Sequence, residues 1–270
     1  MRPRFTYLEN PSIEHDASET TAASDILEPV FECARESSSL LGSRRFVHVG
    51  ETEYEMPQFL LLGARGGGVP IRIGLYGGLD AEQLDTVIAV SRLLLQLELS
   101  PQLAQDFAIF AYPVVNLAGF GWEGEPLLSF RQRFARGHDP DVQFFQNELN
   151  TWKPDGLIFL RSSGANAAMS ATVRSRILAE EVIAPALESL SPAIPVAPTS
   201  VKVLPDSANA RTSDYQSGRL LPHPVTNPWP FEIELFAPDA NVELRVRALF
   251  LGVVEILRRY RSFVAHAGSL

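Results

Sequence analysis

Short apolar runs alternate along this chain with longer segments in which apolar residues recur at helical spacing. The run DFAIFAYPVV at 106–115 is almost unbroken, and GLIFL at 156–160 is of the same kind. Such runs are typical of strands that are covered on both faces of an α/β sheet. Further β-type runs are predicted at 45–50, 58–64, 69–78, 199–204 and 230–236. The glycine-rich ARGGG at 64–68 predicts a hairpin turn between two of these runs.

Helices are predicted where apolar residues follow a period near 3.6. The first predicted helix begins near Ser24 or Asp25, either of which can cap it, and the second follows Gly78. Two more helices are predicted at 172–190 and 240–265. Strands and helices alternate without a clear break in composition. We therefore predict one domain at 25–270 behind a polar tail at 1–24. Its expected fold class is α/β, a three-layer α/β/α arrangement with a mixed, mostly parallel sheet.

The carboxyl ends of the predicted strands are the expected place for a functional site, because ligands of α/β sheets collect there. The residues that follow the predicted strands are Gly78 to Gln83, Asn116 to Phe120, Arg161 to Ser163 and the second half of PFEIELF at 230–236. We expect a binding or catalytic site to be built from these segments.

Composition argues against several classes of function. The 270 residues carry 23 basic and 32 acidic side chains, a formal charge of −9, so the positive surface typical of nucleic-acid or anionic-lipid binding is not expected. One cysteine, Cys33, and five histidines exclude a disulfide framework and a cysteine-based zinc cluster. No apolar run reaches the roughly 18 residues that span a bilayer. Residues 1–16 also lack the apolar core of a signal peptide, so we expect a cytoplasmic protein without membrane or nucleic-acid partners.

An ordered series of motifs follows the predicted strands. In chain order these are IRIGLYGGLDAEQLDTVIAVSRLLLQL, AIFAYPVVNLAGF, PDGLIFLRSS, TSDY and PFEIELFAP. The firmest runs from Pro113 to Asn116 and is followed by Gly119 and Phe120. Together the motifs resemble the zinc carboxypeptidase superfamily, which includes the succinylglutamate desuccinylase and aspartoacylase branch. The resemblance covers about residues 70–262 and implies the carboxypeptidase-type α/β fold.

The resemblance also implies a metal site whose ligands have changed. In that family a His-x-x-Glu pair and a later histidine hold zinc, and a glutamate on a late strand is the general base. The corresponding residues here are Asp80 and Gln83, then Arg161, and finally Glu234 at the general-base position. The oxygen atoms of Asp80 and Gln83 suit magnesium or calcium better than zinc, and a guanidinium has no lone pair to give. We therefore expect Arg161 to replace the metal and to pair with Asp80, Glu234 or both.

The family's substrate-binding asparagine-arginine pair is also altered. It falls on Asp141 and Val142 or on Val142 and Gln143, depending on the register. Arg133 or Arg136 can substitute for it, or both arginines belong to a solvated basic loop. The carboxylate-binding pair of the family therefore has no clear counterpart in this chain.

Other polar residues have two interpretations each. Asn116 can contact a substrate or can bond the turn after its strand. Tyr215, in TSDYQSG, corresponds to a substrate-side loop tyrosine of the family or is an ordinary loop residue. Glu232 and Glu234 both lie in PFEIELF, and we expect one to face solvent and the other to point toward a neighbouring layer or the cleft.

Three functions fit these residues. We favour a carboxypeptidase-like protein that has lost metal and catalysis, needs no cofactor and binds a small molecule or peptide, because all three ligand positions have changed together. The alternative is an active zinc hydrolase, a carboxypeptidase or N-acyl amino acid deacylase. Its rebuilt site would draw on Asp80, Glu82 and Gln83, together with His138 or His223. The third is a metal-free acid/base enzyme using Asp80 and Glu234, but a neighbouring arginine would keep the pKa of both carboxyls low.

Overall fold

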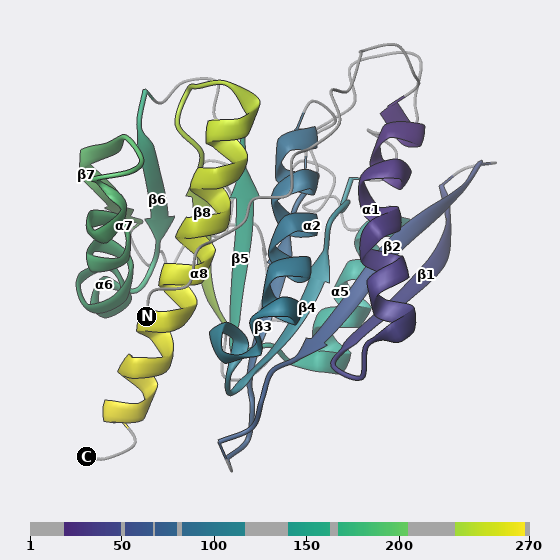
Figure 1. Ribbon diagram of the computed structural model, residues 1–270, viewed down its shortest axis with the longest axis horizontal. Coiled ribbons are helices and arrows are strands. Elements are labelled where there is room, and N and C mark those ends of the chain that lie inside the picture. Colours follow the sequence, from purple (N-terminus) through teal and green to yellow (C-terminus); the bar gives the residue numbers. More distant parts are fainter. Residues whose placement is uncertain are drawn as a thin grey trace, which may run out of the picture.

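The computed structural model describes residues 19–49, 52–66, 68–79, 83–116, 140–162, 167–204 and 230–267. Over these residues eight strands form one sheet in the order β1-β2-β4-β3-β5-β8-β6-β7 (Figure 1). The strands are β1 (Leu40–Val49), β2 (Thr52–Leu62), β3 (Ile71–Tyr76), β4 (Phe107–Tyr112), β5 (Gly156–Arg161), β6 (Met169–Val173), β7 (Val196–Val203) and β8 (Phe231–Phe236). The helices are α1 (Glu19–Glu36), α2 (Leu84–Leu99), α5 (Pro140–Trp152), α6 (Arg176–Leu178), α7 (Ala184–Leu190) and α8 (Val242–Ala267), with a 3₁₀ turn at Pro101–Ala104 and a π-helical turn at Ala179–Ile183.

The sheet is mixed and mostly parallel at its centre. Strands β4, β3, β5 and β8 run parallel to one another. Strand β2 is antiparallel to both β1 and β4, whereas β6 is antiparallel to β8 and parallel to β7. Helices α1, α2 and α8 cover one face and α5 lies on the other (Figure 1). The predicted three-layer α/β fold is confirmed over the described part of the chain.

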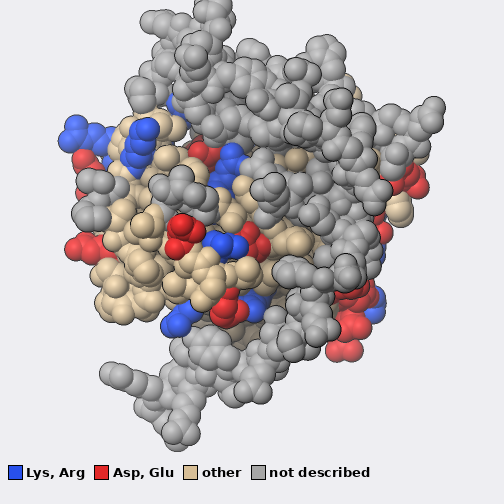
Figure 2. Space-filling model, turned by 90° about the horizontal axis from the view of Figure 1, so that it is seen from above, with Lys and Arg blue, Asp and Glu red and all other residues tan. Residues whose placement is uncertain are grey.

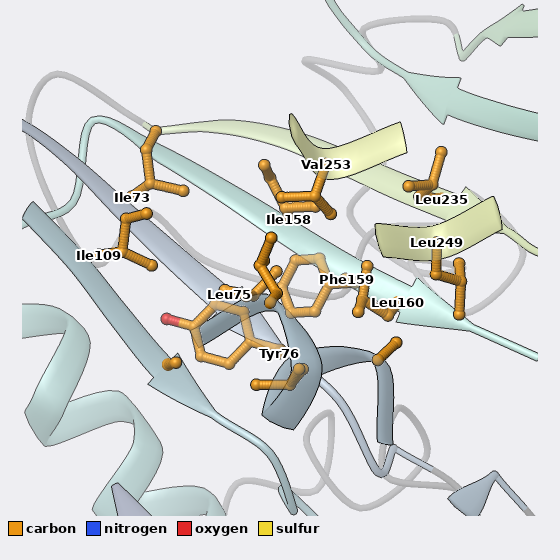
Figure 3. Packing of buried hydrophobic residues seen from close by; sticks show 14 of the residues in the cluster. Ile73, Leu75, Tyr76, Ile109, Ile158, Phe159, Leu160, Leu235, Leu249 and Val253 are labelled. Atoms are coloured by element: carbon orange, nitrogen blue, oxygen red, sulfur yellow. The ribbon is translucent and has the colours of Figure 1, made fainter. Parts of the chain in front are cut away.

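Apolar side chains join α8 to the sheet. Ile158 of β5 lies against Val253, and Leu235 of β8 lies against Leu249 (Figure 3). All four side chains are almost completely buried. Burial of a side chain of this size contributes about 1.5–3 kcal/mol, so this face anchors the strands whose ends form the candidate site.

Three aromatic side chains form what we call the aromatic row on the opposite face: Tyr112, Tyr76 and Phe159, adjacent in register on β4, β3 and β5. The Tyr76 ring stacks on Tyr112 at 5.2 Å and on Phe159 at 4.9 Å between centroids. Phe145 of α5 meets Tyr76 edge-on at 4.9 Å. A Cβ at Gly74 would clash with the Tyr76 side chain, so a glycine is needed where this ring lies over its own strand.

The predicted hairpin across 64–68 is wrong. Strands β2 and β3 do not pair; each flanks β4, and β2 forms its hairpin with β1 instead. All six residues of β4 are buried, and a wholly apolar strand of this kind is best accommodated between two neighbours. The later strand therefore inserts between two strands that are adjacent in sequence.

The structure also contains elements that the sequence pattern did not predict. Helix α5 occupies a segment interpreted as loop, and β6 lies where the pattern predicts the start of a helix. Val142 is fully buried in α5, so the proposed substrate pair that includes Val142 cannot present that side chain to a ligand. Helix α1 begins at Glu19, before the expected cap at Ser24, so 19–24 are helical.

Candidate functional site

The carboxyl ends of β3, β5 and β8 lie side by side at one edge of the sheet, where α2 and α8 begin. Figure 2 views this edge from above, and acidic and basic side chains lie close together on it among residues of other kinds. Gln83 immediately precedes α2, Arg161 ends β5 and Glu234 lies in β8. The predicted site residues Asp80 and Tyr215 lie outside the described residues, as do Glu82, Arg133, Arg136, His138 and His223.

Arg161 and Glu234 belong to the same face of the sheet. Glu234 pairs in register with Phe159, and Arg161 follows Phe159 by two residues. Side chains two residues apart on a strand point to the same side. Glu234 is 8% exposed, and Thr172 Oγ1 of β6 donates to its Oε2 at 3.2 Å. The pairing of Arg161 with Glu234 or Asp80 stays a prediction.

The expectation that one of Glu232 and Glu234 faces solvent is wrong. Both are buried, at 7% and 8% exposure. Because they are two residues apart, they share a face, whereas Ile233 between them packs into the core on the other side. Strand β8 is therefore covered on both faces, and the retained glutamate lies in a buried setting.

Gly78 ties the ends of β3 and β4 together. It has a positive φ of 53°, which favours glycine, and its N–H donates to Thr86 Oγ1 at 2.8 Å. The Thr86 hydroxyl in turn donates to the Gln83 carbonyl at 2.7 Å. The Gly78 carbonyl accepts the N–H of Asn116 at 3.0 Å. Asn116 is buried and its backbone closes this turn, so its position has a structural explanation.

Sequence reasoning missed a buried carboxylate at this edge, that of Asp85 in the first turn of α2. Its side chain is 2% exposed. Its Oδ2 accepts the Ser162 hydroxyl at 2.7 Å and Arg245 Nε at 2.6 Å, and its Oδ1 accepts the Thr86 N–H at 3.0 Å. We call Gln83, Asp85, Ser162 and Arg245 the strand-end network. An acidic residue inside the apolar segment LDTVIAV was the available signal, but its partner lies 160 positions away.

The tyrosines of the aromatic row are structural rather than acid/base groups. Burial raises the pKa of Tyr76 and of Tyr112 well above the usual value of a tyrosine, so both stay protonated at neutral pH. The Tyr112 hydroxyl donates to Glu148 Oε2 of α5 at 2.9 Å, and Trp152 Nε1 donates to the same oxygen at 2.7 Å. Gln58 Nε2 of β2 also donates to this carboxylate, which therefore holds α5 on the sheet.

Solved structures match the fold of this chain, although no protein-family model and no curated protein matches the sequence. A metallo-carboxypeptidase from Burkholderia cenocepacia superposes on 89% of this chain and 68% of its own, with a TM-score of 0.60 and 12% sequence identity. The chain has a metallo-carboxypeptidase-like fold. A metallo-carboxypeptidase from Pseudomonas aeruginosa superposes on 86% of this chain and 67% of its own, with a TM-score of 0.58 and 12% identity. No helix among the described residues is long and apolar enough to cross a membrane.

In this metallo-carboxypeptidase-like fold, the described residues at the metal positions implied by the resemblance do not suit zinc. Gln83 has a neutral amide whose Oε1 accepts the Ser162 N–H at 3.4 Å, and Arg161 has no lone pair to donate. Within the described ranges, no group of three or more His, Cys, Asp or Glu side chains could hold a metal ion. We therefore assign no reaction step to a metal at this edge.

Proposed function

We propose that this chain is a carboxypeptidase-like binding protein that has lost the catalytic metal and takes a small molecule or peptide at the carboxyl edge of its sheet. The observation that carries the proposal is the position of Arg161. It ends β5, lies on the same face of the sheet as Glu234, and directly precedes Ser162, whose N–H donates to Gln83 Oε1. A guanidinium stays protonated at all ordinary pH values. It opposes a cation electrostatically and cannot ligate one, so it favours anionic groups at this place.

A second candidate is an active metallohydrolase, and one observation favours it. Glu234, at the position the resemblance gives to the general base, is kept and is buried beside Thr172. This enzyme would need a rebuilt metal site from residues outside the described ranges, together with a role for Arg161 other than ligation. The binding protein needs neither, so we favour it.

Metal analysis of the purified full chain separates the two candidates. After dialysis, we expect zinc far below one equivalent by inductively coupled plasma mass spectrometry and no heat of zinc binding by calorimetry. We also expect no hydrolysis of N-acyl amino acids or of peptides from their carboxyl end. Near-stoichiometric zinc that survives dialysis and is lost in Asp80→Ala contradicts the proposal.

Two designed variants test the assignment of the positions. The combined change of Asp80→His, Gln83→Glu and Arg161→His should create zinc binding, because it supplies three donors without a competing cation. The matched control carries only Asp80→His and Gln83→Glu, and its retained Arg161 should keep zinc out. Equal zinc binding by the two variants would show that Arg161 does not occupy the metal position.

A further inference from the structure

We propose that Asp85 is a positioning residue of the candidate site, which fixes the end of β5, and with it Arg161, by protein contacts alone. The inference rests on the proposed function, since a metal shared by these strand ends would hold them together by itself. Asp85 lies in the first turn of α2, and its carboxylate accepts hydrogen bonds from Ser162, which follows β5, and from Arg245 of α8. Asp85 is therefore placed to hold these elements together by hydrogen bonds, as a shared metal ion otherwise would.

One carboxylate joins three elements. Asp85 Oδ2 accepts from Ser162 Oγ at 2.7 Å and from Arg245 Nε at 2.6 Å, and Asp85 itself belongs to α2. Arg245 also donates through its NH1 group to the Ala240 carbonyl at 2.7 Å, so the guanidinium fixes the segment that leads into α8. Charge-assisted hydrogen bonds of this kind are short and about twice as strong as neutral ones.

The backbone around Arg161 is held from both sides. Its carbonyl accepts the N–H of Ala237, the residue that follows β8, at 2.9 Å. The next residue, Ser162, donates its hydroxyl to Asp85 and its N–H to Gln83 Oε1 at 3.4 Å. Of these two hydrogen bonds of Ser162, only the long one to Gln83 is left when the Asp85 contact is removed. The end of β5 should then open more often.

The chain contains a matched control between the same two helices. Arg92 of α2 and Glu243 of α8 form an ion pair at 2.9 Å, but their side chains are 34% and 66% exposed. Those of Arg245 and Asp85 are 23% and 2% exposed. Water screens the outer pair, whereas the buried carboxylate depends on its donors. A substitution of Glu243 therefore removes an α2–α8 ion pair without removing a contact of the strand-end network.

Amide hydrogen exchange, followed by mass spectrometry on the full chain with and without EDTA, tests the inference. Asp85→Asn and Ser162→Ala should each raise exchange at 156–162 and in the first turn of α2 by roughly tenfold, the factor expected when a buried hydrogen bond to a charged group is lost. Glu243→Gln should leave these segments unchanged. Ser162→Thr keeps the hydroxyl and should restore the wild-type rate. Ser162→Ala, which removes one hydroxyl, carries the test if Asp85→Asn does not fold.

The outcomes separate the two proposals. An equal rise over the whole sheet, or a response no larger than that of Glu243→Gln, overturns the positioning role while leaving the proposed function intact. A rise at 156–162 in the wild-type chain on adding EDTA alone shows that a metal joins the strand ends, and this contradicts the proposed function. A local rise in both variants with no response to EDTA supports both.

Discussion

The aromatic row and the strand-end network both hold β5 in place, but by opposite physical means. The row consists of uncharged rings that are buried and stacked at 4.9 and 5.2 Å. The network centres on one buried carboxylate with donors at 2.6 and 2.7 Å. Packing tolerates a substitution of similar volume, whereas a charge removed from water depends on each of its partners. The row therefore stabilises the fold, and the network sets the geometry of the strand ends at the candidate site.

The largest loss of stability should come from removing an aromatic ring from the aromatic row. Phe159 is fully buried and stacks on Tyr76, so Phe159→Ala should lower the free energy of unfolding by about 3–5 kcal/mol, measured by chemical denaturation. Phe159→Leu is the matched control and should cost clearly less, because it leaves most of the volume filled. Equal losses for the two variants would mean that the row does not act through packing.

An intermediate effect should come from the strand-end network, measured as a double-mutant cycle. Asp85→Asn and Arg245→Met should each cost about 1.5–3 kcal/mol, with a coupling free energy of about 1–3 kcal/mol between them. The same cycle on Arg92 and Glu243 should give only about 0.2–1 kcal/mol, because both side chains are a third or more exposed to water. If the inner pair couples no more strongly than the outer one, burial does not distinguish them.

Near pH 10, the smallest effect should come from alkali, which acts on the row and not on the network. Burial raises the pKa of Tyr76 and Tyr112, so the native state favours their protonated forms. This stabilisation is complete well below the unfolded pKa of about 10 and is lost as pH rises through it, by about 0.4 kcal/mol per tyrosine at pH 10 and by more at higher pH. Denaturation at increasing pH measures the slope. Tyr112→Phe should reduce the slope, and Ser162→Ala should leave it unchanged.

The fold could be predicted further than the site. The unbroken apolar run of β4 predicted a covered strand, and the long periodic segment of α8 predicted a helix packed on one side. Both predictions were possible because each pattern is local in the sequence. Strand order is not local, which is why the hairpin across 64–68 was wrongly predicted. Helix α5 was missed because polar residues surround the buried Val142, Phe145 and Leu149, although their spacing of three and four residues was visible in the sequence.

The site residues divide in the same way. Gln83, Arg161 and Glu234 follow from the order of motifs along the chain, and the structure brings their strand ends together. Asp85 and Arg245 could not be paired from one sequence, because 160 residues separate them and Arg245 lies in no motif. The shared burial of Glu232 and Glu234 was predictable from strand periodicity, which places residues i and i+2 on one face.

The Glu148 carboxylate has a practical consequence for following this molecule in solution. It accepts the indole N–H of Trp152, whose ring lies 4.8 Å from that of Phe110 on β4. The last turn of α5 thus places an intrinsic fluorophore where helix and sheet meet. Because indole emission shifts to longer wavelength in water, a variant that keeps only Trp152 of the three tryptophans should report by its emission wavelength whether α5 is docked.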